Sequence, residues 1–231
     1  MGTPAFTTQI RKAGTPTAFL EAPMSEDTSY DGEGYLYVID DELKSVWERT
    51  TPVRVYGDGV EIDYDDYRAD YLFGRVLFQE QPNEPVTVTG EYLPIGGLYD
   101  DEDTRIPGAH SHDLNLEMDL LDNTNYVDVQ DQGGYRSRVT GLLDASISLE
   151  RYDDSWKEIR KAFSRREPVL IDVRPGNEYT FRGWFVVESN EQSGSVDDLE
   201  SNDLNFQLDN LVDHKGRQIS MGWKDIIPFN A

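Results

Sequence analysis

Histidines and carboxylates are the residues of this sequence whose types and spacing could do chemistry. His110 and His112 lie two residues apart, so a strand would place both on one face, where Asp113 or Glu117 could complete a metal site. We interpret the pair instead as surface or interface histidines, and His214 as a lone residue of a turn. No Ser, His and Asp arrangement for nucleophilic catalysis can be placed from the spacing.

Three acidic clusters are formal candidates for Ca²⁺ binding or for the paired carboxylates of glycoside hydrolysis. They are Asp63, Asp65 and Asp66; Asp100, Asp101, Glu102 and Asp103; and Asp197, Asp198 and Glu200. None matches a complete calcium loop with its glycine and terminal glutamate, so we interpret the clusters as solvated loops. The calcium candidate that remains is Asp100, Asp101 and Asp103.

Composition excludes several further classes of site. The chain has no cysteine, so disulfides, thiol nucleophiles and cysteine-ligated metals are excluded. No glycine-rich phosphate loop follows a strand, and we interpret the basic cluster from Lys157 to Arg166 as a helix face that pairs with a neighbour's acids. We therefore predict no catalytic residue, no cofactor and no enzymatic activity.

The chain is strongly acidic. Its 45 Asp and Glu residues outnumber 21 Lys and Arg residues, which gives a formal charge of −24 over 231 residues. Adhesion to duplex DNA or to an anionic membrane is unfavourable at such a charge. The excess of acidic residues is also typical of a solvated surface that is adapted to high salt. No segment approaches the roughly 20 apolar residues that span a bilayer, so we expect a protein made and used in soluble form.

Strand patterns dominate the elements that must position these residues. Residues 1–33 are rich in Pro, Gly, Thr and Ser and predict an arm or loop with one short strand near Phe6–Ile10. Residues 34–98 predict a β-rich part, including a hairpin around Gly57-Asp58-Gly59 that buries Val53, Val55, Val60 and Ile62, and a strand from Asp66 to Phe78. Residues 99–111 form an acidic Gly/Pro loop.

The second half, residues 112–231, predicts a β-sandwich, either as a separate domain or as one continuous domain with the first half. Residues 112–120 and 138–150 alternate apolar and polar residues, as half-buried strands do, and further strands follow at 169–173, 178–188 and 201–209. A capping box at Ser155 and Glu158 begins a short flanking helix at about 155–164, which ends before Pro168. The apolar tail from Ile219 to Ala231 should dock on this subunit or on a neighbour. The predicted fold class is mainly β, sandwich-like or barrel-like, with long loops and arms.

The order of elements from Arg138 to Asn210 resembles the tail tube proteins of long-tailed bacterial viruses. The resemblance lies in the strand Gly141–Leu149, the helix after it, the strand Phe181–Ser189 and the segment Ser195–Leu199 that leads to a last strand. It covers about residues 110–210 and is a pattern of order and residue type. The long N-terminal half and the missing Gly-rich C-terminal end depart from that pattern.

The resemblance implies a structural virion protein that assembles into stacked hexameric rings, with inner strands joined into one barrel. Six copies at −24 each carry −144, and an acidic lumen would let viral DNA pass without specific binding. The implied partners are further copies and other tail proteins, with no membrane, and the implied location is the virion tail, assembled in the host cytoplasm. The assembly candidates are Ile147, Leu149, Trp156, Ile159, Phe163, Trp184, Phe206, Trp223 and Phe229.

Two alternatives from other classes stay open at this point. One is a virion protein of the head–tail joint or tail tip, which would form a ring that never polymerises. The other is a Ca²⁺-binding or carbohydrate-binding β-sandwich from a salt-loving source, which would be a monomer whose melting temperature rises with its ligand.

Overall fold

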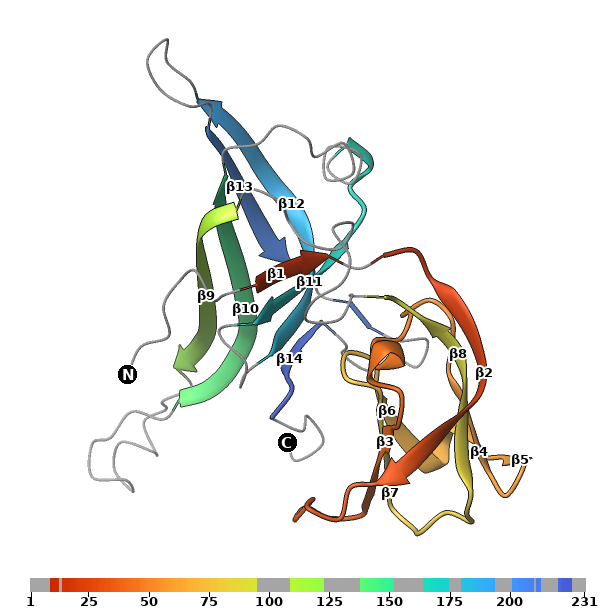
Figure 1. Ribbon diagram of the computed structural model, residues 1–231. Coiled ribbons are helices and arrows are strands. Elements are labelled where there is room, and N and C mark those ends of the chain that lie inside the picture. Colours follow the sequence, from red (N-terminus) through yellow and green to blue (C-terminus); the bar gives the residue numbers. More distant parts are fainter. Residues whose placement is uncertain are drawn as a thin grey trace, which may run out of the picture.

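Two curled β-sheets make up the computed structural model of the chain (Figure 1). The structure describes residues 9–12, 14–94, 109–122, 138–151, 164–174, 180–193, 201–209, 211–212 and 220–225. The N-terminal sheet holds strands from residues 17–92, and the C-terminal sheet holds the later strands together with one strand from residues 9–12. The predicted fold class, mainly β, is confirmed.

The N-terminal sheet has seven strands in the order β5-β4-β8-β2-β3-β7-β6, and all neighbours are antiparallel. Their bounds are β2 Thr17–Glu26, β3 Tyr35–Ile39, β4 Arg54–Gly57, β5 Val60–Glu61, β6 Tyr67–Asp70, β7 Arg75–Phe78 and β8 Val86–Tyr92. Two 3₁₀ turns, Glu42–Lys44 and Tyr64–Asp66, are each capped by an aspartate side chain that accepts a backbone N–H.

Aromatic residues fill the core of the N-terminal sheet. Alternate positions of β8 are buried, and Trp47, Tyr37 and Tyr71 are among the largest fully buried side chains. The ring of Trp47 meets Tyr71 edge to face at 6.1 Å. The fourteen buried members of this core are Phe19, Ala22, Met24, Tyr37, Ile39, Trp47, Val53, Val55, Tyr67, Tyr71, Val76, Phe78, Val86 and Val88. Such rings bury a large apolar area per residue, so a sheet of short strands gains a full core.

Three local predictions for this half were wrong. The segment expected to be an arm contains β2, a ten-residue strand in the middle of the sheet whose bulge places Glu21 at φ 44°. The strand expected from Asp66 to Phe78 is instead a hairpin, because the chain turns at Gly74, where φ is +64° and a Cβ would lie 2.8 Å from Ser45 Cα. The hairpin at residues 54–61 is confirmed, but Val60 is 69% exposed because it lies at the tip.

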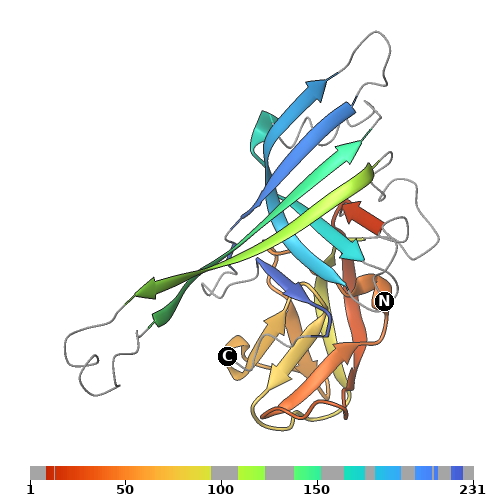
Figure 2. The ribbon, with the colours of Figure 1, turned by 90° about the vertical axis from the view of Figure 1, so that its left-hand side faces the viewer.

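The C-terminal sheet also has seven strands, in the order β1-β11-β12-β13-β10-β9, with β14 paired to β12. Their bounds are β1 Gln9–Lys12, β9 Ala109–Asp122, β10 Arg138–Arg151, β11 Val169–Arg174, β12 Phe181–Ser193, β13 Ser201–Leu208 and β14 Met221–Trp223. All pairs are antiparallel. Figure 2 shows β9 with β10, and β12 with β13, as two long ribbons that extend in different directions from the middle of the sheet.

One apolar core lies inside the curl of this sheet. Its buried members come from β10, β11, β12 and β13, and they are Ala145, Ile147, Leu149, Ile171, Val173, Phe181, Phe185, Leu204 and Phe206. The predicted alternation along β10 is confirmed, because residues 145, 147 and 149 are buried and their neighbours are not. Trp223 of β14 packs against Phe181 with ring centroids 5.0 Å apart, so this part of the C-terminal tail docks on its own subunit as predicted.

The sheet's strands are longer than the sequence predicted. Strand β9 begins at Ala109, within the expected acidic loop, and β12 continues to Ser193, five residues beyond its predicted end. Residues 164 and 165 are helical, whereas the rest of the predicted helix at 155–164 lies outside the described residues. The calcium candidate Asp100, Asp101 and Asp103 also lies outside them.

Candidate assembly interface

Strand β9 is an open edge of the C-terminal sheet. This fourteen-residue strand pairs with β10 from Asp122↔Arg138 to Ala109↔Arg151, with two register shifts, and no strand of the described chain pairs with its other side. An edge of this length presents a long row of unpaired backbone N–H and C=O groups. Leu116, in the middle of the edge, is 41% exposed, which leaves an apolar side chain beside these groups.

The distal half of strand β12, residues 186–193, is a second open edge. The proximal half, residues 181–185, pairs with β11 on one side, and part of it pairs with β14. Beyond Phe185 the described chain offers β12 only one neighbour, β13, with which it pairs as far as Ser193↔Ser201. A bulge between Val187 and Ser189 lies near the start of the distal half. The four-stranded region β9-β10-β13-distal β12 therefore has an open edge on each side.

A polar face covers this four-stranded region on the side away from the core. Ser148 Oγ donates to Asn205 Oδ1 at 2.8 Å, and Asn205 Nδ2 donates to Ser189 Oγ at 2.8 Å, so three strands are joined by one chain of side-chain hydrogen bonds. Gln207 Nε2 donates to the carboxylate of Asp144 at 2.7 Å. The side chains that the structure describes on this face include no Lys or Arg. Beside the apolar Val186, they are Asp113, Asn115, Asp144, Ser146, Ser148, Glu150, Ser189, Asp203, Asn205 and Gln207.

The N-terminal sheet is fixed to the C-terminal sheet at the proximal half of β12. Arg182, 6% exposed, donates to Asp172 Oδ2 at 2.8 Å within its own sheet. It also donates across the junction to the Leu72 carbonyl at 2.6 Å and to Ser45 Oγ at 3.3 Å. A small apolar cluster surrounds these bonds, made of Val46, Leu72, Phe73, Leu93, Leu170 and Trp184. The two sheets therefore share a buried ionic and apolar junction.

Each charged group described at the junction has an oppositely charged or aromatic partner. Burial lowers the pKa of the Arg182 guanidinium, and the charge of Asp172, which is fully buried, acts in the opposite direction. Arg174 donates to the same carboxylate at 2.7 Å. The guanidinium of Arg49 lies 5.0 Å from the centre of the Trp184 ring, a distance at which the ring face attracts a cation. The buried carboxylate of Asp172 therefore has two guanidinium partners, and such charge-assisted hydrogen bonds fix its position.

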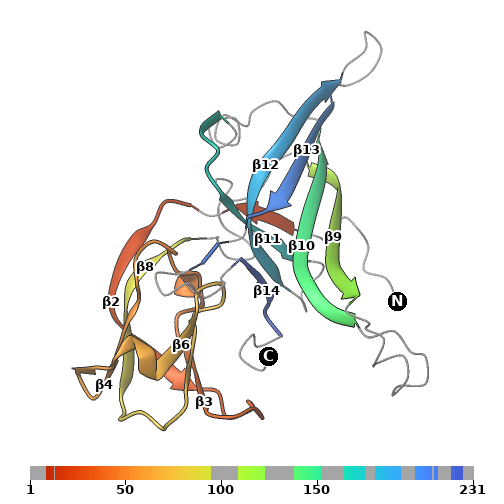
Figure 3. The same cartoon turned by 180° about the vertical axis from the view of Figure 1, so that it is seen from behind.

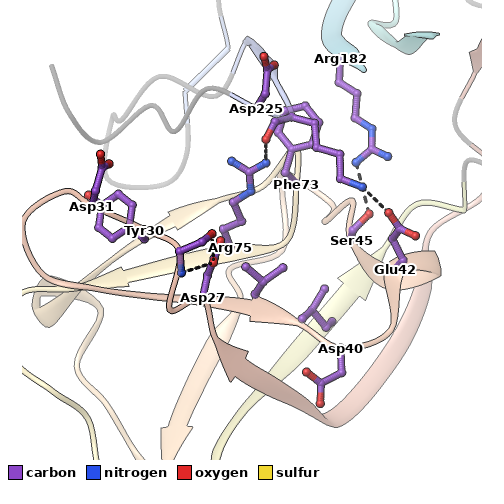
Figure 4. A pocket seen from close by; sticks show the side chains of 14 residues that line it. Asp27, Tyr30, Asp31, Asp40, Glu42, Ser45, Phe73, Arg75, Arg182 and Asp225 are labelled. Carbon is purple, nitrogen blue, oxygen red and sulfur yellow. Dashed lines mark hydrogen bonds and ion pairs between the residues drawn. The ribbon is translucent and has the colours of Figure 1, made fainter. Parts of the chain in front are cut away.

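A cavity of about 650 Å³ opens at the rim of this junction. Figure 4 shows Arg75 between Asp27 and Asp225, with Arg182 near Ser45. Lys224 pairs with Glu42, and the Lys224 carbonyl accepts from Arg75, so β14's end is tied to the N-terminal sheet as well. The walls combine five carboxylates with three cations, so the cavity has no single charge character: Asp27, Asp31, Asp40, Glu42, Asp225, Arg75, Arg182 and Lys224.

The structure places the described assembly candidates inside the fold. Ile147, Leu149 and Phe206 lie in the core of the C-terminal sheet, and Trp184 lies at the junction. Trp223 is half-buried against the same core. The remaining candidates, Trp156, Ile159, Phe163 and Phe229, lie outside the described residues. A role of any of them in assembly stays a prediction, and the described ones could act only by shaping the subunit.

The described residues contain neither a metal-binding cluster nor a membrane-spanning helix. Within those ranges, no three His, Asp or Glu side chains are placed to hold a metal ion. The side chains of His110 and His112 lie outside the description, although both residues belong to β9. No helix among the described residues is long and apolar enough to cross a bilayer.

Sequence reasoning missed the open half of β12 and the ionic junction. The polar run Ser189-Asn-Glu-Gln-Ser193 follows the predicted strand 178–188 and is typical of a loop, although its small and polar residues also suit a strand with solvent on one face. Arg182 and Asp172 are both charged residues within apolar strands, and that placement was the signal for a buried pair.

Comparisons with known proteins match the C-terminal half of the chain. Residues 99–213 match the sequence model of a family described as phage tail tube protein. A chain in the tail of an empty gene transfer agent particle, refined with C6 symmetry, aligns with a TM-score of 0.41 and 22% identity over 45% of this chain and 78% of that one. A chain of the native gene transfer agent virion aligns with a TM-score of 0.42 and 23% identity over 49% and 89%. No curated protein matches the sequence significantly.

Proposed function

Residues 99–213 place this chain in the phage tail tube protein family, and from that premise we propose that its copies close head to tail into a ring through the two open edges. The protein is a structural component of a virion tail. In the proposed ring, β9 of one copy pairs with distal β12 of the next, and rings of six copies stack into the tube. The observation that carries the proposal is the pair of open edges on opposite sides of one four-stranded region.

The strand directions are compatible with this closure. Neighbours in the order β12-β13-β10-β9 alternate in direction, so β12 and β9 run opposite ways. A rotation about an axis along the strands keeps their directions, and β9 would therefore meet the neighbour's β12 as an antiparallel partner. The contact is heterologous, because different edges of the two copies meet, and a heterologous contact whose rotation closes makes a ring without free edges.

The polar face of the same four strands then lines the lumen. Its described acidic members are Asp113, Asp144, Glu150 and Asp203. Between them, Ser148, Asn205 and Ser189 bond to one another, and Gln207 bonds to Asp144. Phosphates that pass such a wall meet like charge and no described cation, so the wall does not hold them. This arrangement supports an acidic lumen for the passage of viral DNA.

Disulfide cross-linking between copies tests the ring contact directly, since the chain contains no cysteine of its own. Cross-linked copies appear on a denaturing gel as a ladder of oligomers. Cross-strand neighbours have Cβ atoms about 4.5–5.5 Å apart, close to disulfide geometry. Double variants Asn115→Cys with Ser189→Cys, and Asp113→Cys with Ser189→Cys, sample two registers between β9 and distal β12. On mild oxidation of assembled protein, we expect one of them to give covalent oligomers that end at the ring size, six copies, on a denaturing gel.

The matched control carries Ser146→Cys with Ser189→Cys. Ser146 lies on β10, one strand in from the edge, and should give only monomers. Negative-stain microscopy of the same samples at low and high salt should show tubes with a central hole. Tubes without any ladder in either register would contradict the proposed edges, and rings that never stack would favour a head–tail joint protein.

A further inference from the structure

We infer that the N-terminal sheet lies on the outer wall of the tube and forms an acidic coat there. The inference rests on the proposed function, because it takes the polar face of the four-stranded region as the lumen side. The N-terminal sheet lies outside the family match at residues 99–213, so its place in an assembled tail is assigned here from the fold of this chain alone.

The C-terminal sheet folds over its own core, so its two halves point their outer faces in opposite directions. Ile147 of β10 and Phe206 of β13 share the core with Ile171 of β11 and Phe181 of proximal β12. Side chains alternate along each strand, so residues of opposite parity in both halves point away from that core. The four-stranded region is one layer of a sandwich, and β11 with proximal β12 belongs to the other layer.

The outer face of that second layer is the face that carries the N-terminal sheet. Leu170, Asp172, Arg182 and Trp184 have the opposite parity from the core residues of β11 and β12. Leu170 and Trp184 contact the N-terminal sheet in the junction cluster, and Arg182 bonds to it. Figures 1 and 3 show the N-terminal sheet beside β11 and β14, away from β9 and β10. A lumen on the polar face of the first layer therefore places the N-terminal sheet outside.

The junction keeps the N-terminal sheet in this position. Arg182 is buried and bonded in both sheets, Arg49 lies over Trp184, and Lys224 pairs with Glu42. To move to the lumen side, the N-terminal sheet would have to expose this apolar cluster and break the bonds from Arg182 to the Leu72 carbonyl and to Ser45 Oγ. Both changes cost free energy, because apolar area returns to water and a buried guanidinium loses hydrogen bonds.

The N-terminal sheet also carries more than its share of the acidic charge. Residues 17–92 contain 18 of the 45 acidic residues and 5 of the 21 basic ones, a net charge of −13 out of −24. On an outer wall these charges face solution around the whole tube. Like charge on neighbouring tubes and on free nucleic acid keeps both from adhering to the wall.

A labelling experiment on assembled tubes tests the location. Single variants Leu20→Cys and Val60→Cys carry the thiol at positions that are 80% and 69% exposed on the N-terminal sheet. The matched variant Ser148→Cys carries it on the polar face, where Ser148 is exposed in the single subunit. The probe is a maleimide on a polyethylene glycol chain too bulky to enter the lumen. Each variant is labelled before assembly and again as tubes, with microscopy of the same samples.

The expected result is labelling of Leu20→Cys and Val60→Cys at similar rates in tubes and free subunits, and protection of Ser148→Cys by about tenfold or more in tubes, since access then needs opening of the assembly. Labelling of either N-terminal position in intact tubes supports the outer location. Protection of both in intact tubes overturns it, even if the lumen assignment holds. Labelling of Ser148→Cys in tubes contradicts the proposed lumen face instead. A failure of the protein to form tubes overturns both the lumen face and the outer location of the N-terminal sheet.

Discussion

The two sheets of this protein have the same number of strands but very different edges. The N-terminal sheet ends in β5 and β6, which have two and four residues. The C-terminal sheet ends at one side in β1, with four residues, but at the other in β9, with fourteen, and it leaves the distal half of β12 open. Short edge strands give little backbone for another chain to pair with, and long ones invite pairing. The N-terminal sheet offers short edges, and the C-terminal sheet is the part that other copies complete in the proposed ring.

The variant with the largest expected effect is Ile147→Asp, in the C-terminal sheet. Ile147 is fully buried in the core of the C-terminal sheet, so the variant would bury an unpaired carboxylate and lose apolar packing. We expect a loss of about 4 kcal/mol or more in the free energy of unfolding, with no rings in the microscope. Ser148→Asp is the control, because that residue points to the polar face and should keep the circular dichroism of the parent. Soluble rings formed by Ile147→Asp would show that this core does not support assembly.

Arg182→Met tests how much the bonds across the junction contribute to the stability of the protein. Among the described residues, the variant leaves Asp172 buried with Arg174 as its remaining salt-bridge partner, and it removes the donor to the Leu72 carbonyl. Breaking a buried pair by removing one partner costs about 3–5 kcal/mol, which urea unfolding would measure. Arg174→Met is the matched control: it removes the other cation on Asp172 but no bond to the N-terminal sheet, so it should cost less. An equal loss in both variants would mean that the junction bonds contribute little.

Asp70→Asn tests the core of the N-terminal sheet by its pH dependence. Burial raises the pKa of the Asp70 carboxyl above its ordinary value of 3.8, and Arg75 acts in the opposite direction. The folded state therefore binds a proton that the unfolded state has released, and this group's contribution to stability falls as pH rises above 3.8. We expect the variant to gain stability relative to the parent between acidic and neutral pH, measured by urea unfolding at several pH values. A difference that does not change with pH would contradict the raised pKa.

Lys224→Gln should have the smallest effect. Lys224 and Glu42 are both well exposed, so their ion pair contributes less than about 1 kcal/mol. The hydrogen bond from Lys224 lowers the pKa of Glu42, so this stability is present at neutral pH and is lost as pH falls through the lowered pKa. Melting temperatures of parent and variant should differ slightly at neutral pH and converge in acid and in high salt. A large loss at neutral pH would mean that the rim of the junction, and not Arg182, holds the sheets together.

Local patterns explain what the sequence predicted correctly. The alternation from Leu143 to Glu150 requires one buried and one polar face, and Gly57-Asp58-Gly59 supplies the positive φ angles of a hairpin turn, at Asp58 and Gly59. Strand β2 was missed because Pro23 and the bulge at Glu21 interrupt its alternation. The Asp66–Phe78 segment was assigned one strand because its aromatic residues continue through the turn at Gly74.

Long-range pairing explains what could not be predicted. Arg182 meets Leu72 across 110 residues, and nothing in either local sequence identifies the other. The open half of β12 depends on where β11 stops pairing, which is a property of the sheet and not of the segment itself. The polar face of β10 could be predicted from alternation, but its continuation onto β13 and β12 required the registers.

Strand β12 belongs to both layers of the C-terminal sheet, and this continuity has a mechanical consequence. Its distal half lies in the proposed ring wall, and its proximal half carries the junction with the N-terminal sheet. Hydrogen bonds to neighbouring strands lie across the strand, so a pull along β12 stretches many of them together in shear, instead of unzipping them one at a time. A tail that bends would pass tension from its inner wall to its coat through this strand, and both would deform as one elastic body.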